Sequence, residues 1–273
     1  MGYDDGMEKA GRKSNRSGLD QALTGLDQRR EQAHTAAMPV SYTPLIPINI
    51  ASIYNGPLPH RMAQCTPDTK EAIEAVARDL AAMGYGIRLS DLFRSHDMQA
   101  QSHADFVEGR KKAFSPPPGG SLHEAGRAMD IDLSSIGVPL SQFWEIAKAH
   151  GFHPIIDAPD PHRSESWHFD CWGSHGAVYD YVKAGKAGTM LSPYTQMAES
   201  AILAIGVKLD AIPAQDVAFL QAGLIRLGLD PGRIDGVQGN RTVKALGDAG
   251  ANLGDPLTWM SDALKTKFPA EYV

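Results

Sequence analysis

Two short segments of the chain carry side chains that could together bind a metal ion. Residues 121–130 read Ser-Leu-His-Glu-Ala-Gly-Arg-Ala-Met-Asp, and residues 165–168 read Glu-Ser-Trp-His. Ligands from His123, Asp130 and His168 would leave one position of a tetrahedral zinc ion open to water, which is typical of catalytic rather than structural zinc sites. Glu165 would be a free carboxylate beside that water and could take its proton.

The spacing of these residues indicates how the chain must position them. The seven-residue interval between His123 and Asp130 suits a loop residue that faces a strand residue, because helical ligand pairs stand closer in sequence. Gly126 gives the chain the freedom to turn between them. Strand alternation over residues 128–133 would place Asp130 and Asp132 on one face and the apolar residues on the other.

Each residue also has a simpler interpretation. A lone His123 would be a surface or capping residue, and a lone Glu165 would be solvated. Asp130 lies between Met129 and Ile131, and a carboxylate inside an apolar strand needs a partner. An extended chain would put Glu165 and His168 on opposite faces, so we expect Glu165 in a turn just before a strand.

The remaining patterns predict an α+β domain with a small, mainly antiparallel sheet and flanking helices, followed by a small all-α domain. Residues 38–60 contain five prolines and should be extended. We expect three parts, at residues 1–59, 60–188 and 189–273. The predicted helices cover residues 17–37, 67–83, 96–112, 141–150, 216–227, 240–246 and 257–267, and the predicted strands cover residues 87–93, 128–133 and 167–171.

Composition narrows the class of protein. Hydrophobic residues make up 42% and charged residues 21% of the chain, as in globular proteins with a core. The formal net charge of −6 argues against a nucleic-acid binder. No run is long enough for a membrane span, and the first forty residues lack the layout of a secretory signal. The two cysteines, Cys65 and Cys171, could form a bridge or be two small buried hydrophobes.

The two motifs resemble those of the zinc D-alanyl-D-alanine peptidases. This group includes the vancomycin-resistance D,D-dipeptidases and carboxypeptidases and the phage L-alanyl-D-glutamate endopeptidases. The shared pattern is Ser-x-His-x-x-Gly-x-Ala-x-Asp followed by Glu-x-Trp-His, and every fixed position is present. Upstream, Phe93-Arg94-Ser95 with Gln99 is similar to the arginine segment of that family. The resemblance covers about residues 60–185.

The resemblance implies a role for each matching residue. His123, Asp130 and His168 would bind Zn²⁺, and Glu165 would be the general base. Arg94 would stabilise the developing oxyanion or hold a substrate carboxylate, unless it forms only a surface salt bridge. Ser121 and Trp167 would support and orient the ligands. Asp132 and Asp170 could do the same or be exposed strand residues.

Residues 216–246 resemble the three-helix peptidoglycan-binding module. The Asp235-Gly236 turn and the following Gly239-x-x-Thr242 carry this similarity. The aromatic residue that usually ends the last helix is missing, because residues 247–250 read Gly-Asp-Ala-Gly. The module would bind cell-wall glycan or be a structural extension.

These expectations give a zinc metallopeptidase that hydrolyses peptidoglycan stem peptides, as a D-alanyl-D-alanine carboxypeptidase or D,D-endopeptidase. An L-alanyl-D-glutamate endopeptidase of the endolysin type is the alternative within the enzyme class. A non-catalytic, zinc-containing wall-binding or virion structural protein is the alternative outside it. The protein would act at the cell wall, in the periplasm or outside the cell, and would be phage-encoded or exported by a non-classical route.

Overall fold

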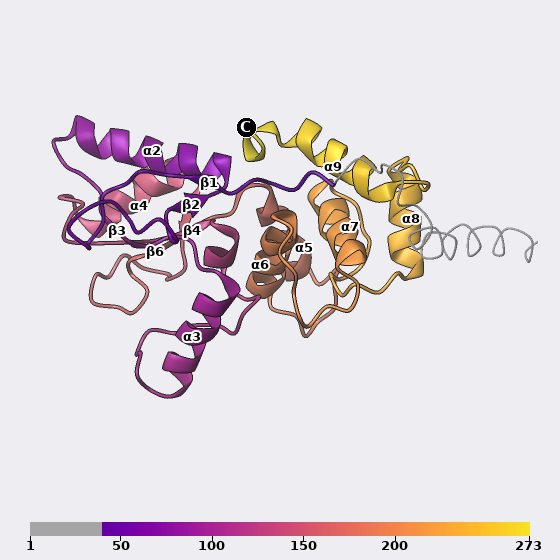
Figure 1. The fold of residues 1–273 in the computed structure, drawn as a ribbon, viewed down its shortest axis with the longest axis horizontal. Coiled ribbons are helices and arrows are strands. Elements are labelled where there is room, and N and C mark those ends of the chain that lie inside the picture. The colour runs from indigo at the N-terminus through magenta and orange to yellow at the C-terminus, as the bar shows by residue number, and fades with distance from the viewer. Residues whose placement is uncertain (1–39) are drawn as a thin grey trace, which may run out of the picture.

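A small antiparallel sheet with helices on one face forms one end of the molecule, and helices alone form the other (Figure 1). The computed structural model describes residues 40–273. The predicted helix at residues 17–37 lies outside this range. The α+β class is confirmed.

The sheet has four short strands in the order β3-β4-β6-β5, and every neighbouring pair is antiparallel. Its central strands are the fully buried β4 and β6. Their register places Asp130 opposite His168. The strands span Leu89–Asp91 (β3), Ala128–Ile131 (β4), Phe152–Pro154 (β5) and His168–Cys171 (β6).

Two amphipathic helices, α2 (Pro67–Ala82) and α4 (Leu140–Ala149), pack on the sheet. Helix α2 begins with an extended Thr66 and a proline at its first position, where the missing N–H costs nothing. The sequence predicts an apolar stripe of Ile73, Val76, Leu80 and Met83. The first three are fully buried in the core of the sheet, whereas Met83 follows the end of the helix and is 39% exposed. From α4, the ring of Phe143 packs edge-on against Phe169 of β6.

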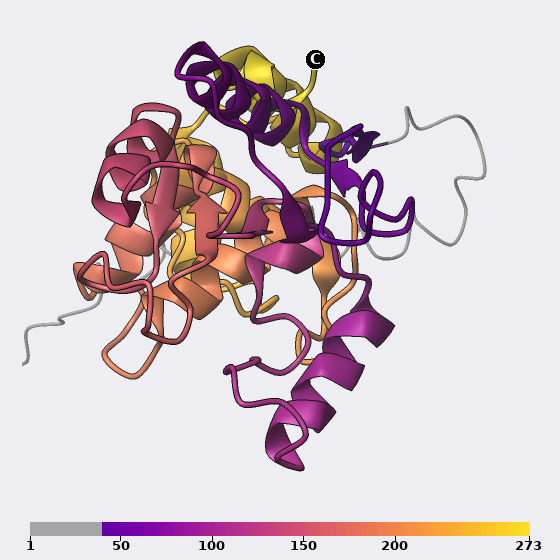
Figure 2. The ribbon, with the colours of Figure 1, turned by 90° about the vertical axis from the view of Figure 1, so that its left-hand side faces the viewer.

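Helix α3 (His96–Val107) stands away from the rest of the molecule (Figure 2). Its N-cap is Ser95, whose Oγ accepts a hydrogen bond from the N–H of Met98 at 3.4 Å. Gln99 is its one buried residue. The helix is therefore attached near its N-terminus, and a loop from residue 108 to residue 121 returns the chain to the sheet.

The described part of the proline-rich segment is extended, as predicted. It forms strand β1 (Ile46–Pro47), which pairs with β2 (Gln64–Cys65). Ser52 forms an isolated parallel bridge with Leu89 of β3. This segment therefore extends the β structure at the outer edge of the sheet. Cys65 and Cys171 are both free and buried.

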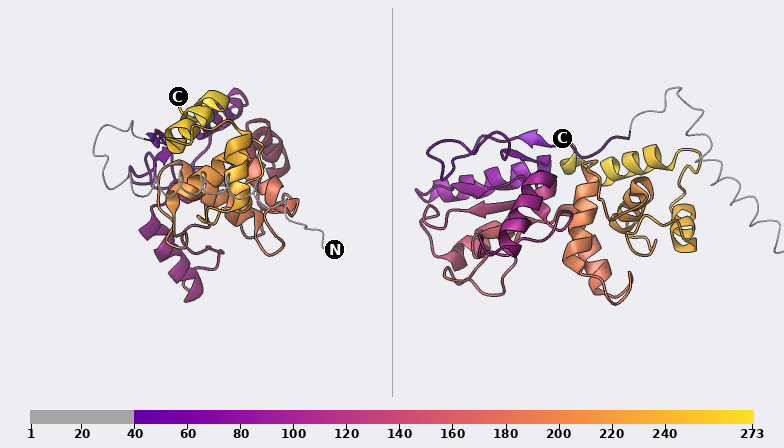
Figure 3. Two further views of the ribbon diagram at one scale, coloured as in Figure 1. Left: turned by 90° about the vertical axis from the view of Figure 1, so that its right-hand side faces the viewer. Right: turned by 60° about the horizontal axis from the view of Figure 1, so that its bottom comes forward.

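The helical end contains α5 (Gly176–Lys183), α6 (Pro193–Ala204), α7 (Gln215–Arg226), α8 (Asn240–Asp248) and α9 (Pro256–Lys267). Figure 3 shows these helices gathered beside the sheet. A second core joins α5, α6 and α7 to Leu122, Ala125 and Ala128, which belong to the first motif. After α9 the short helix η3 (Pro269–Glu271) packs on α2. The helical end therefore supports the sheet directly.

The predicted helices within residues 40–273 are confirmed, and the predicted strands are present but shorter. The prediction missed α5, α6 and strands β1, β2 and β5. The domain boundaries after residues 59 and 188 stay a prediction. No helix of the described residues is long and apolar enough to cross a membrane.

Gly126 should be indispensable to the turn between the motif residues. Its φ is +63°, and a Cβ there would lie 2.9 Å from the Cα of Cys65. We expect Gly126→Ala to lower the free energy of unfolding, measured by urea denaturation, by more than the roughly 1–2 kcal/mol that a left-handed conformation costs an alanine. Gly109→Ala is the matched control, because Gly109 has a φ of +74° with no atom within 4 Å of the added Cβ. Equal losses in the two variants would contradict the steric argument.

Candidate metal centre

The three predicted ligands meet at one point, although they come from three segments of the chain. His123 lies in the 3-10 helix η1 (Leu122–Ala125), Asp130 in β4 and His168 in β6. They are 1%, 8% and 6% exposed. Together they form a group that could hold a metal ion, and their burial would shield such an ion from solvent on the protein side.

The distances between the ligand atoms fit one face of a tetrahedron. His123 Nε2 lies 3.3 Å from His168 Nδ1 and 3.3 Å from Asp130 Oδ1. His168 Nδ1 lies 2.9 Å from Asp130 Oδ1. A tetrahedral zinc ion with ligands at about 2.0–2.1 Å holds neighbouring ligand atoms about 3.3 Å apart. The three side chains therefore fit a zinc ion with a fourth position left for another ligand.

The other nitrogen of each imidazole is held by an acceptor. His123 Nδ1 lies 2.7 Å from the carbonyl oxygen of Leu92, and because a carbonyl only accepts, Nδ1 carries the proton. His168 Nε2 lies 2.9 Å from Asp170 Oδ1, which favours a proton on Nε2. With a metal bound, each ring would therefore present its unprotonated nitrogen to the ion, because the outer acceptor holds the proton on the other nitrogen.

The charges of neighbouring side chains shift the pKa values of Asp130 and His168. Burial alone would raise the pKa of Asp130, but His123 and His168 lower that pKa well below its ordinary value. Burial would lower the pKa of His168, but Asp170 and Asp130 raise that pKa to about 10. Without a metal, a proton therefore provides the positive charge that balances the buried carboxylates. A cation at the same position would provide that charge instead and displace the proton.

A capping box fixes the turn that carries His123. Ser121 Oγ accepts a hydrogen bond from the N–H of His123 at 3.3 Å, and the Glu124 carboxylate accepts from the N–H of Ser121. Glu124 also accepts from the N–H of Gly119 at 2.9 Å. Burial raises the pKa of Glu124 to about 7 despite these hydrogen bonds. Glu124 was not among the predicted residues, although the Ser-x-x-Glu spacing is a capping signal.

Arg94 lies directly beside the group. Its Nε donates to Asp91 Oδ2 at 2.5 Å, and its Nη2 donates to Asp130 Oδ2 at 3.3 Å. Its Nη1 donates to Gln99 Oε1 at 3.3 Å. Burial would lower the pKa of Arg94, but Asp91 and Asp130 raise that pKa. Arg94 does form ion pairs, but it is only 9% exposed, so these pairs are buried and not on the surface.

Glu165 occupies the predicted turn before β6. Its φ of +69° is one of two positive values among the described non-glycine residues, and its carbonyl accepts from the N–H of His168 at 3.1 Å. Its half-buried carboxylate accepts a hydrogen bond from the hydroxyl of Ser164 at 3.4 Å. Within residues 40–273 it forms no hydrogen bond with His123, Asp130 or His168. Burial raises the pKa of Glu165, and the charges of His168 and Asp130 also act on it.

Trp167 contributes to the site through its backbone and its packing. Its carbonyl accepts a hydrogen bond from the N–H of Ile131 at 2.9 Å, which continues the pairing of β4 with β6 beyond Asp130. Its half-buried side chain packs against the core of the sheet. This contact is consistent with the predicted supporting position behind the ligands.

The two uncertain aspartates differ in their environment. Asp170 is fully buried, and its Oδ1 contacts His168 and accepts from the hydroxyl of Tyr194 on α6 at 3.2 Å. Asp132 pairs at 2.5 Å with Arg88, whose side chain is half exposed. Asp170 therefore orients a candidate ligand, whereas Asp132 belongs to the surface.

Arg127 holds the two ligand strands from behind and was not predicted. It is fully buried, and its Nε donates to the carbonyl of Cys171 in β6 at 3.0 Å. Its Nη1 donates to Asp68 and to Thr66, both at 2.9 Å. This buried ion pair ties the start of α2 to both strands. Its only sequence signal is an arginine next to an apolar strand.

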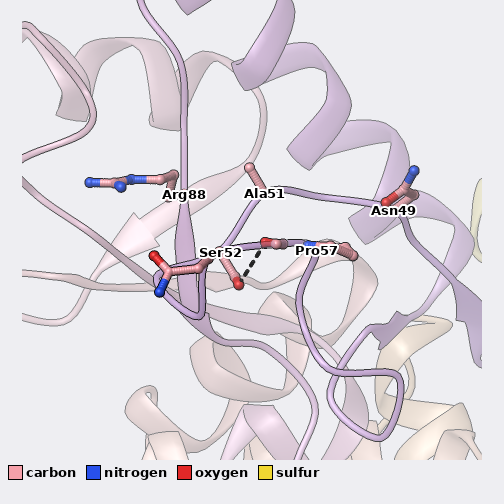
Figure 4. Close-up of a pocket in the computed structure, with 7 residues that line it drawn as sticks. Asn49, Ala51, Ser52, Pro57 and Arg88 are labelled. Carbon is pink, nitrogen blue, oxygen red and sulfur yellow. Dashed lines mark hydrogen bonds between the residues drawn. The ribbon is translucent and has the colours of Figure 1, made fainter.

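A separate pocket lies at the outer edge of the sheet (Figure 4). It has a volume of about 470 Å³, and its lining consists of Asn49, Ala51, Ser52, Asn55, Gly56, Pro57 and Arg88. Ser52 Oγ donates to the Gly56 carbonyl at 2.9 Å inside it. None of the candidate site residues lines this pocket, so we do not assign it a role in the chemistry.

No family model matches the chain, and no curated protein matches its sequence. Several solved structures resemble part of it, among them the following two. The LdcB LD-carboxypeptidase is 18% identical with a TM-score of 0.38, over 49% of this chain and 71% of that one. The L,D-carboxypeptidase DacB from Streptococcus pneumonia is 18% identical with a TM-score of 0.32, over 47% of this chain and 85% of that one.

Metal affinity should depend on the residues that orient the ligands. We expect Asp170→Asn to weaken zinc binding about 10–100-fold, because the imidazole of His168 loses its anionic acceptor. His123→Gln, which removes a ligand, should weaken it further. Asp132→Asn is the matched control and should bind zinc as the parent does. Competition with a chromophoric chelator measures all of these affinities, and equal affinity of the two aspartate variants would contradict the assignment.

Proposed function

We propose that the chain is a zinc-dependent peptidase that hydrolyses peptidoglycan stem peptides. The observation that carries this proposal is the tetrahedral face formed by His123, Asp130 and His168. The substrate class comes from the motif resemblance, whose fixed positions include these three residues and Glu165. The activity that we propose first is that of a D-alanyl-D-alanine carboxypeptidase or D,D-endopeptidase.

We propose zinc as the metal because of the types of the three candidate ligands. Two neutral imidazoles and one carboxylate suit zinc, and three protein ligands are the number that a catalytic zinc site uses. When bound, zinc would polarise the scissile carbonyl and lower the pKa of a coordinated water to about 7. The buried surroundings strengthen this effect, because water competes less for the charges.

The residues of the chain supply the remaining steps. Glu165 takes the proton of the attacking water and passes it to the leaving amine, a role that its raised pKa suits. Arg94 stabilises the negative charge that develops on the carbonyl oxygen. Asp91 and Asp130 hold the guanidinium in place from two sides. Leu92 and Asp170 keep both histidines in the tautomer that can bind the metal.

The metal group alone fits several stem-peptide bonds, because bond specificity comes from loops around a site. L-alanyl-D-glutamate endopeptidase activity is therefore the alternative within the class. A non-catalytic wall-binding or virion structural role is the alternative outside it. We place that role second, because the motif resemblance includes Glu165, the residue that we propose as the general base.

Glycan binding by the C-terminal helices stays a prediction. The helices form a cleft of about 720 Å³ that is lined by residues of α7, α8 and α9, among them Val217, Thr242 and Leu257. Binding of the full chain to purified sacculi, with and without a Val217→Asp substitution, would test whether this cleft holds glycan.

Peptidase activity is tested with defined muropeptides that end in D-alanyl-D-alanine, in a single D-alanine or in a cross-link. We expect the zinc-loaded chain to cleave at least one of them, and a chelator to abolish the cleavage. Glu165→Gln should lower kcat by about 10²-fold or more, because the general base is lost. Glu145→Gln is the matched control, an exposed glutamate on α4, and should keep full activity. Mass spectrometry of the products identifies the bond.

The products separate the candidate functions. Released D-alanine supports a carboxypeptidase, and a new amino-terminal D-glutamate supports the endopeptidase. Unchanged turnover in a Glu165→Gln variant with full zinc content would contradict the mechanism. Binding to sacculi without any product would support the non-catalytic alternative.

A further inference from the structure

Within residues 40–273, Lys111 forms no ion pair, although hydrogen bonds connect it to the candidate metal group. Lys111 lies in the loop that follows α3 and is half buried. Its Nζ donates a hydrogen bond to Ser102 Oγ of α3 at 2.9 Å. Among the described residues no carboxylate lies within ion-pair distance of this ammonium group. An ammonium with three donors therefore has unused capacity for an anion.

Polar contacts connect Lys111 to the site step by step. Ser102 Oγ accepts from Ser115 Oγ at 3.0 Å, and Ser115 Oγ accepts from Gln99 Nε2 at 3.1 Å. The other end of the Gln99 amide accepts from Arg94 Nη1 at 3.3 Å. This chain runs from α3 to the guanidinium beside Asp130. It fixes Lys111 relative to the metal group, although Lys111 itself lies on a loop.

The charges of the site act on Lys111 directly. Burial and then the positive charge of Arg94 lower the pKa of Lys111, while Asp130, Glu165 and Asp91 act in the opposite direction. Lys111 and the candidate site residues therefore influence one another electrostatically, and the hydrogen bonds through Ser102, Ser115 and Gln99 connect them. Its stem is partly buried, so its ammonium group has fewer positions available than that of an exposed lysine.

Arg94 and Lys111 differ in how far their charges are already balanced. All three nitrogens of Arg94 have acceptors, and two of those acceptors are carboxylates. The one acceptor of Lys111 is a neutral hydroxyl. A negatively charged substrate group would gain more from Lys111, because no protein carboxylate competes for it.

We propose that Lys111 binds the free C-terminal carboxylate of the peptide substrate and so makes the enzyme a carboxypeptidase. This inference rests on the proposed peptidase function and names the substrate class within it. The carboxylate of the residue beyond the scissile bond would lie at Lys111, and the scissile carbonyl would lie at the metal position. Arg94 is then left to stabilise the oxyanion. A peptide that continues past this residue, or ends in an amide, lacks the charge that Lys111 recognises.

The test compares how tightly the zinc-loaded chain binds two peptides that differ only at the C-terminus. The full chain carries Glu165→Gln to prevent turnover, and its zinc content is measured. The probes are a stem pentapeptide that ends in D-alanyl-D-alanine and the same peptide as the C-terminal amide, and titration calorimetry gives both affinities. We expect the acid to bind more tightly. We expect Lys111→Gln to weaken binding of the acid about 10–100-fold, the loss of one charged hydrogen bond, and to leave the amide unchanged.

Two further variants keep the test specific. Lys112→Gln removes the same charge from the exposed neighbouring residue and should leave both affinities unchanged. Lys111→Arg keeps a cation at the position and should keep the preference for the acid. A Lys111→Gln variant that still prefers the acid, or that loses affinity for both peptides equally, would overturn the proposal.

The result also separates this proposal from the peptidase function on which it rests. If the chain without the Glu165 substitution binds the acid through Lys111 but releases no product, hydrolysis is wrong and carboxylate recognition stands. If that chain releases product but shows no preference between acid and amide, the peptidase function stands and the role of Lys111 is wrong.

Discussion

The site depends on the register of two neighbouring strands, because it places Asp130 directly opposite His168. Residues on one face of a strand alternate with those on the other, so a shift by one residue would turn one ligand into the core. Arg127 helps to prevent such a shift, since it contacts the carbonyl of Cys171 in β6 and anchors both strands to Asp68. His123 then completes the group from a turn that Gly126 and the Glu124 cap hold in place.

The charged side chains around Asp130 and His168 are buried or half-buried, and they pair with one another. Asp130 is neutralised from one side by the histidines and from the other by Arg94, and Arg94 is also paired with Asp91. Asp170 balances His168 and connects it through Tyr194 to helix α6. Because a buried charge without a partner costs several kcal/mol, each of these groups depends on its neighbour. The helical end therefore contributes to the electrostatics of the site as well as to its packing.

The grouping of His123, Asp130 and His168 could be predicted because these residues belong to a fixed pattern of residue types over short spans of sequence. Helix α2 could be predicted because its capping proline and its apolar stripe are local signals. Helix α6 was missed because eight of its twelve residues are buried, among them the polar Gln196 and Ser200, so its polar residues do not mark one exposed face. Strand β5 has only three residues, too few for an alternation to be recognised. The position of Arg127 depends on contacts with Thr66, Asp68 and Cys171, which lie far from it in the sequence, and no local pattern encodes such contacts.

We propose that two imidazoles and one carboxylate hold a zinc ion with a position left for water. X-ray absorption at the zinc edge can test this coordination. The sample is the full chain loaded with one equivalent of zinc. We expect the spectrum of a four-coordinate ion with nitrogen and oxygen ligands at about 2.0–2.1 Å and with the scattering of two imidazole rings. His123→Gln should remove the signal of one ring. A spectrum dominated by sulfur at about 2.3 Å, or one without imidazole scattering, would contradict the account.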